Sequence, residues 1–151
     1  MSRALVVGIG NDLRRDDGVG RVVADAVGRL VAGVDVRLEH QVLPELAEIL
    51  IGYDRVVFVD AAGQGALDRG GVVVREVGPT ARVVRGHVAD PGVVLALAAM
   101  LGGPVPQAWL VTVRAGDFGH GEGLSPATAA LALQALAAVR ELCRGEASSG
   151  I

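Results

Sequence analysis

The sequence predicts an α/β protein of three layers (α/β/α), in which helices cover both faces of a central five-stranded, mostly parallel sheet. Short runs of Val, Leu and Ile alternate along the chain with segments whose apolar residues recur every three or four positions. Such alternation implies crossover connections, which place helices on both faces of a parallel sheet. The length of 151 residues suits a single domain, predicted over residues 1–144 and followed by a frayed tail at 145–151.

Five apolar segments are expected to form the strands. They are Ala4–Ile9, Val34–Leu38, Arg55–Asp60, Val72–Val74 and Ala108–Val113. The third and fourth segments are joined through Gly63-Gln64-Gly65, which is too short for a helical crossover. We therefore expect the fourth strand to be antiparallel or to lie at an edge of the sheet.

Three helices are predicted in the first hundred residues. The first has an apolar stripe formed by Val19, Val22, Val23, Ala26, Val27 and Leu30. The second is expected over Val42–Ile51, because Pro44 and Glu45 favour a helix start. The third is expected over Pro91–Leu101.

The last helix has the clearest start. Ser125 is the predicted N-cap, and Pro126 suits the first helical position. The face predicted to be buried consists of Leu133, Leu136, Val139 and Cys143.

Composition argues against several classes of partner. A net charge of -3 and an aromatic content of 3% are poor for nucleic-acid binding, so no nucleic-acid partner is expected. Cys143 is the single cysteine, which excludes an intrachain disulfide and fits a reducing cytoplasm. The uncharged stretch Pro91–Trp109 is interrupted by proline and glycine and makes a poor membrane span. We expect a cytoplasmic protein without a membrane partner.

Polar residues that follow the predicted strands indicate where chemistry could occur, because ligands of open α/β sheets bind at the carboxyl ends of the strands. Asp17 follows the first strand, Asp60 ends the third, and His87 lies in the loop after the fourth. Two carboxylates and one imidazole suit a divalent metal with open positions or general acid–base catalysis. No Gly-x-Ser-x-Gly elbow or paired-histidine helix motif is present.

Each of these residues also has a plainer interpretation. Asp16 is better explained as a helix cap that complements the helix dipole, and for Asp17 the two interpretations are about equal. Asp60 ends a strongly apolar strand, where a carboxylate needs a partner, and this favours function. His87 by itself resembles an ordinary loop histidine. The remaining histidines, His40 and His120, carry a weaker signal.

Four motifs, taken in order, resemble one known family. The segment Gly8–Gly20 contains a strand end, Gly-x-Gly-Asn, an acidic pair and a glycine-containing helix start. Val57–Ala61 resembles a second acidic strand end, Gly86-His87 a histidine segment, and Gly123–Pro126 the start of the last helix. Together they resemble the [NiFe]-hydrogenase maturation endopeptidases over nearly the whole chain.

The resemblance implies an endopeptidase of aspartic or metal-assisted type. Such enzymes remove a C-terminal extension from the large-subunit precursor of a [NiFe] hydrogenase after nickel insertion. The metal-contacting and catalytic set then corresponds to Asp17, Asp60 and His87, and the nickel is carried by the substrate rather than held by the free enzyme. Gly10, Asn11 and His40 are the expected substrate-binding residues. Asp17 stands where the family often has Glu.

Three alternatives remain open at this stage. A non-catalytic nickel-binding or chaperone module would use the same three ligands. A general peptidase of this fold would cut peptides without a metal centre. A nucleotide-binding domain is disfavoured, because Gly8-x-Gly10 lacks the third glycine of a dinucleotide fingerprint.

Overall fold

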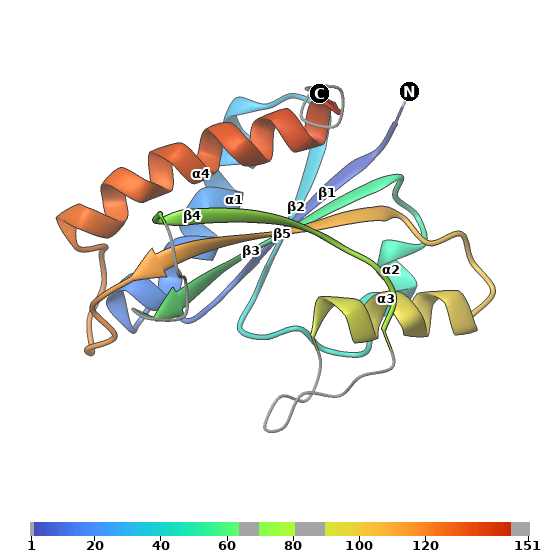
Figure 1. Ribbon diagram of the computed structural model, residues 1–151, viewed down its shortest axis with the longest axis horizontal. Coiled ribbons are helices and arrows are strands. Elements are labelled where there is room, and N and C mark those ends of the chain that lie inside the picture. The colour runs from blue at the N-terminus through green and yellow to red at the C-terminus, as the bar shows by residue number, and fades with distance from the viewer. Residues whose placement is uncertain (1, 64–69, 81–89, 146–151) are drawn as a thin grey trace.

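The structure is a computed structural model that describes residues 2–63, 70–80 and 90–145. Figure 1 shows strands crossing the centre of the molecule, with helices on both sides. The elements in chain order are β1 (Ala4–Ile9), the 3₁₀ turn η1 (Arg15–Gly18), α1 (Val19–Leu30), β2 (Val34–Glu39), α2 (Leu46–Leu50), β3 (Arg55–Gly63), β4 (Val72–Val77), α3 (Pro91–Met100), β5 (Gln107–Ala115) and α4 (Pro126–Arg144).

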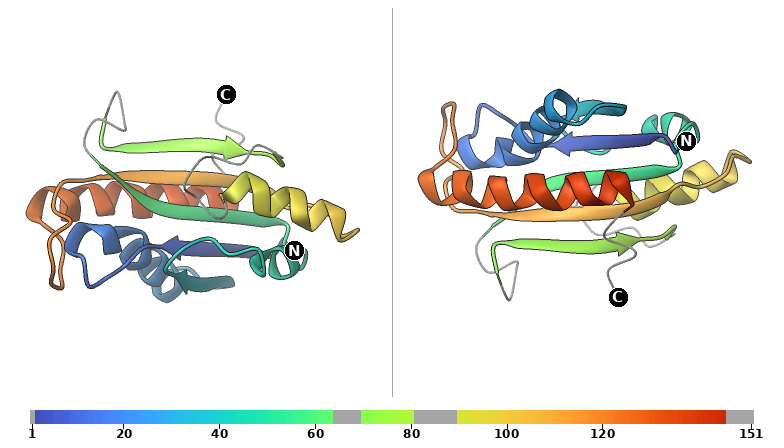
Figure 2. Two further views of the ribbon diagram at one scale, coloured as in Figure 1. Left: turned by 90° about the horizontal axis from the view of Figure 1, so that it is seen from below. Right: turned by 90° about the horizontal axis from the view of Figure 1, so that it is seen from above.

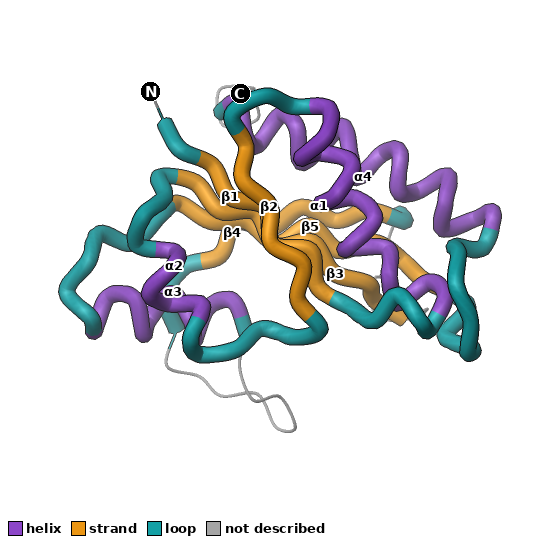
Figure 3. The backbone as a smooth tube through the Cα atoms, turned by 180° about the vertical axis from the view of Figure 1, so that it is seen from behind, coloured by secondary structure: helices purple, strands orange, loops and turns teal. Residues whose placement is uncertain are grey.

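The five strands form one sheet in the order β2-β1-β3-β5-β4. All neighbouring pairs are parallel except β4 and β5, which are antiparallel, so the predicted sheet is confirmed. Figure 3 shows β2 at one edge of this sheet. The chain moves from β1 to β2 on one side and then places β3 on the other side of β1. The strand order therefore reverses between β1 and β3, which is where open α/β sheets bind their ligands.

Two apolar clusters lie on the two faces of the sheet. One contains Val6 of β1 and packs against α1 and α4, and the other contains Leu5 and Val7 and packs against α2 and α3. Successive side chains of a strand point to opposite faces, which explains why neighbours in β1 separate in this way. Figure 2 shows α4 in front of the strands from one side and α3 in front of them from the other. The predicted three-layer fold is confirmed.

Both ends of α4 follow local signals. The Ser125 hydroxyl accepts a hydrogen bond from the Thr128 backbone N–H at 3.4 Å, which confirms the predicted N-cap. Gly145 has a φ of 79°, the left-handed conformation in which glycine commonly ends a helix. Beyond Gly145, the predicted frayed tail lies outside the described residues.

Several predicted boundaries and faces are wrong. The second helix was expected over Val42–Ile51, but α2 spans only Leu46–Leu50. Three residues of the predicted buried stripes are exposed: Val22 at 46%, Leu30 at 71% and Leu133 at 70%. The buried faces of α1 and α4 use smaller residues at neighbouring positions, including Ala24, Ala132 and Ala135. Small side chains let these helices lie close to the sheet and to each other, and an apolar stripe cannot reveal that preference.

The third strand is longer than predicted. It does not end at Asp60 but continues to Gly63, paired with β5 up to Ala115. Its pairing with β1 stops earlier, at Gly8 and Val59. Asp60 is therefore the first residue of β3 beyond its pairing with β1.

Within the described residues, no helix is both long and apolar enough to span a membrane.

Candidate active site

The first segment of the candidate site is the loop that carries Asp17. After β1 the chain passes through η1 and enters α1 at once. At Gly10, φ is 144°, and a side chain there would collide with the backbone carbonyl of Asp17. A side chain at Gly20 would collide with the carbonyls of Ile9 and Val59. These two glycines therefore allow the start of α1 to lie directly on the ends of β1 and β3.

Asp17 is partly buried in this loop and is oriented by the backbone. Its Oδ2 atom accepts a hydrogen bond from the Asn11 N–H at 2.9 Å. The Asn11 side chain contributes to the same turn, because its Oδ1 accepts from the Leu13 N–H at 3.0 Å. The predicted substrate-binding residue Asn11 thus shapes the loop around Asp17, and its contact with substrate remains a prediction.

Asp60 lies on β3, one residue beyond its last pair with β1, and the strand order reverses between these two strands. Burial raises its pKa to about 6, although the Ala61 N–H, which donates to Oδ1 at 2.8 Å, opposes this shift. The negative charge of Asp17 raises the pKa further. Asp17 and Asp60 are therefore close enough to interact electrostatically, as expected for carboxylates at the ends of adjacent parallel strands.

The predicted histidines are placed only in part. His87 lies outside the described residues, so its convergence with Asp17 and Asp60 stays a prediction. Within the described ranges, no three His, Cys, Asp or Glu side chains are grouped closely enough to hold a metal ion.

His40 is exposed and follows β2 directly. The Gly10 N–H donates to the carbonyl of Glu39 at 3.0 Å. Glu39 directly precedes His40, so the backbone at His40 lies near the start of the loop that carries Asp17.

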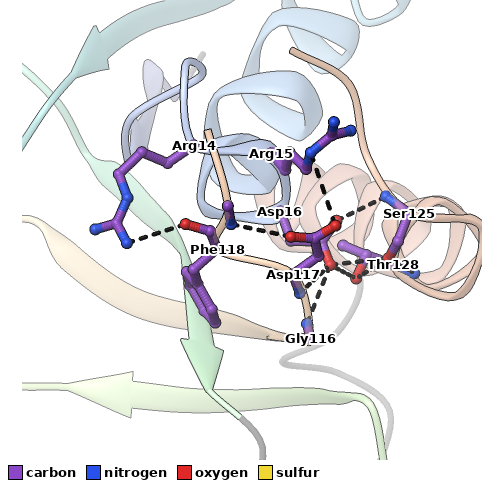
Figure 4. Close-up of polar contacts among 9 residues, drawn as sticks. Arg14, Arg15, Asp16, Gly116, Asp117, Phe118, Ser125 and Thr128 are labelled. Carbon is purple, nitrogen blue, oxygen red and sulfur yellow. Dashed lines mark hydrogen bonds and ion pairs between the residues drawn. The ribbon is translucent and has the colours of Figure 1, made fainter. Parts of the chain in front are cut away.

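The interpretation of Asp16 as a helix cap is wrong. Its side chain makes no cap hydrogen bond and is completely buried. Burial alone would raise its pKa, but hydrogen bonds from Ser125, Asp117 and Gly116 outweigh that effect and hold the pKa at about 2. Figure 4 shows these donors around the Asp16 carboxylate. Because the donors lie about a hundred residues away in the sequence, no local pattern could identify them.

The arrangement suits acid–base chemistry at a carboxylate pair. One of the two carboxyl groups has a pKa near neutrality, which allows it to take up or release a proton at physiological pH.

The remaining predicted core residue, Cys143, is buried in the cluster beneath α1 and α4, and burial raises the pKa of its thiol to about 11. That environment confirms it as a core residue.

Comparison with known proteins gives structural matches only. No family model and no curated protein sequence matches the chain. Among solved structures, the hydrogenase maturating endopeptidase HybD from E. coli is 21% identical, with a TM-score of 0.72 over 98% of this chain and 94% of that protein. The [NiFe] hydrogenase maturation protease HycI from Thermococcus kodakarensis KOD1 is 25% identical, with a TM-score of 0.70 over 95% and 93%.

A third similar structure is the [NiFe] hydrogenase maturation protease HybD from Thermococcus kodakarensis. It is 21% identical, with a TM-score of 0.68 over 93% of this chain and 99% of that protein. The matches cover nearly the full length of both partners, so they concern the whole fold rather than one motif. The resemblance seen in the sequence motifs is thus confirmed by structure, and the chain has the fold of the [NiFe]-hydrogenase maturation proteases.

Proposed function

We propose that this chain is an endopeptidase that removes a C-terminal extension from the large-subunit precursor of a [NiFe] hydrogenase after nickel insertion. The observation that carries the proposal is the interacting pair of Asp17 and Asp60 at the strand-order reversal. Similar solved structures are named as hydrogenase maturation proteases, which supports the same role here. The cytoplasm is the proposed location, since a single buried cysteine suits a reducing compartment.

Nickel enters this proposal as part of the substrate. Carboxylate oxygens and an imidazole nitrogen are ligands that a divalent ion of borderline softness accepts. Asp17 and Asp60, with His87 as the proposed third ligand, match a nickel ion carried by the precursor. Recognition through the metal would restrict cleavage to precursors that have already received it.

Two mechanisms fit the carboxylate pair. In the aspartic type, Asp17 and Asp60 share the task of activating water and protonating the leaving amine, which requires one carboxyl group that titrates near neutral pH. In the metal-assisted type, the same residues hold the metal-bearing segment while the ion polarises water or the scissile carbonyl. Only the second type requires the metal for the chemical step itself.

The decisive experiment compares processing of nickel-loaded and nickel-free precursor by the purified protein. We expect cleavage of the loaded form alone. Cleavage of both forms, or of unrelated peptides, would instead indicate a general peptidase. Tight nickel binding by the isolated protein without any cleavage would indicate a non-catalytic nickel module.

Site variants test the assignment of residues. Asp17→Asn and Asp60→Asn should each abolish processing while the circular dichroism spectrum stays unchanged, and His87→Ala should do the same. Asp12→Asn is the matched control, because Asp12 lies on the same loop and its side chain is 59% exposed. Normal processing by Asp17→Asn or Asp60→Asn would contradict the site.

A further inference from the structure

Asp16 is completely buried, yet it directly precedes the candidate catalytic residue Asp17. Its Oδ1 accepts from the Ser125 N–H at 2.7 Å. Its Oδ2 accepts from the N–H groups of Gly116 and Asp117 at 3.0 and 2.9 Å, and from the hydroxyls of Ser125 and Thr128 at 2.8 and 2.9 Å. Both carboxylate oxygens are therefore engaged, and neither is exposed to a substrate.

All of these donors belong to one segment, the β5–α4 loop with the first turn of α4 (residues 116–128). The bonds link η1 to residues that lie 100 to 112 positions later in the chain. Figure 4 shows the Asp16 side chain directed from η1 toward Gly116, Asp117, Ser125 and Thr128 of this segment. A buried carboxylate surrounded by matched donors is a strong and geometrically specific connection.

Backbone contacts reinforce the same connection. The N–H groups of Arg15 and Asp16 donate to the carbonyls of Gly121 and Asp117 at 3.0 and 2.9 Å. Arg15 has a φ of 45°, a left-handed conformation that a residue with a side chain rarely adopts. Such strain persists where the surrounding contacts determine the backbone, so the β5–α4 segment imposes the path of this loop.

The path of the loop sets the place of Asp17. Among the described residues, the side chain of Asp17 has a single hydrogen bond, to the Asn11 N–H at 2.9 Å. Its position relative to Asp60 therefore depends on the backbone of η1, which Asp16 holds.

We propose that Asp16 is a positioning residue that fixes Asp17 relative to Asp60 by anchoring η1 to the β5–α4 segment. This inference rests on the proposed function, in which Asp17 and Asp60 act together. Asp16 itself does not touch the substrate. A misplacement of about 1 Å at a reacting group can lower a rate by roughly a hundredfold, so loosening this anchor should be visible in kcat.

The kinetic test uses Asp16→Asn and the milder Thr128→Val, which removes one of the two hydroxyl donors. The matched control is Val139→Ala, a core change in the same helix that lies outside residues 116–128. At a temperature where circular dichroism shows every variant folded, kcat and KM are measured on nickel-loaded precursor. We expect kcat to fall by roughly tenfold or more in Asp16→Asn and by less in Thr128→Val, with KM changed less than about twofold. Val139→Ala should keep the kcat of the wild type.

A second readout does not depend on activity. Hydrogen exchange of the Asn11 amide reports its bond to Asp17. With each variant measured at the same number of degrees below its own melting temperature, this exchange should be several-fold faster in Thr128→Val than in Val139→Ala. Wild-type exchange at Asn11 in both Asp16→Asn and Thr128→Val would overturn the positioning role. Failure of the wild type to process any precursor would contradict the proposed function alone, since the exchange result stands independently.

Discussion

Asp16 and Asp60 both lie near the carboxyl ends of the central strands, but their surroundings are opposite. Asp16 has five hydrogen bonds from the protein and a pKa of about 2. Among the described residues, Asp60 accepts one hydrogen bond, from its neighbour Ala61, and its pKa is about 6. Burial disfavours the charge in both cases, and the two pKa values differ because Asp16 has several donors, whereas Asp60 has few in the described part of the chain and lies near the charge of Asp17. The carboxylate with many donors stays ionised down to low pH, and the one with few takes up a proton near pH 6.

The largest effect is expected from Asp16→Ala. The substitution leaves buried backbone N–H groups and hydroxyls without an acceptor, so the free energy of unfolding should fall by roughly 3–5 kcal/mol. Denaturant unfolding at pH 7 measures this loss. Because the pKa of Asp16 is lowered in the folded state, its contribution should be present above about pH 4 and disappear as the pH falls toward 2. A loss below about 1 kcal/mol would contradict the comparison.

Asp60→Asn should have the opposite sign. The pKa of Asp60 is raised in the folded state, so its charge lowers the stability as the pH rises from about 4 to about 6. Removing the charge should therefore raise the free energy of unfolding by roughly 2–3 kcal/mol at pH 8. The gain should vanish below about pH 3, where the carboxyl group is largely protonated in both states. Unfolding curves at the two pH values test this, and a gain independent of pH would assign it to another cause.

Thr128→Val removes a single hydrogen-bond donor from Asp16. We expect a loss of roughly 1–2 kcal/mol in the free energy of unfolding and a rise in the pKa of Asp16. Thermal denaturation and carboxyl-carbon NMR titration provide the two measurements. Thr128→Ser retains the hydroxyl and is the matched control, which should leave the pKa of Asp16 near its original value.

The smallest effect concerns the interaction between the two candidate catalytic carboxylates. In Asp17→Asn the pKa of Asp60 should fall slightly toward its ordinary value, because the charge of Asp17 raises that pKa less than burial does. NMR titration of the Asp60 carboxyl carbon measures the shift. Asp12→Asn, which removes an exposed charge from the same loop, should leave the pKa of Asp60 unchanged. Equal shifts in both variants would show a general charge effect instead of proximity.

The pattern of residues along the chain predicts the class of fold and places Asp17 and Asp60 at the carboxyl ends of the strands. Apolar runs such as Ala4–Ile9 and the N-cap signal at Ser125 depend on neighbours in the chain, and they were predicted correctly. The places of Asp17 and Asp60 after apolar strands also single them out as candidate site residues, and their catalytic role stays a prediction. Periodicity is a local property, and it predicts local structure well.

The surroundings of the individual carboxylates depend on contacts between distant parts of the folded chain. Asp16 and Asp17 are adjacent and chemically identical in the sequence, but the donors that distinguish them come from residues 116–128. The extension of β3 beyond Asp60 likewise depends on its partner β5, and the choice of Ala24 over Val22 as a buried residue of α1 depends on how closely the helix approaches the sheet. A pKa and a packing distance are set by groups brought together through space, and a pattern along the chain does not contain that information.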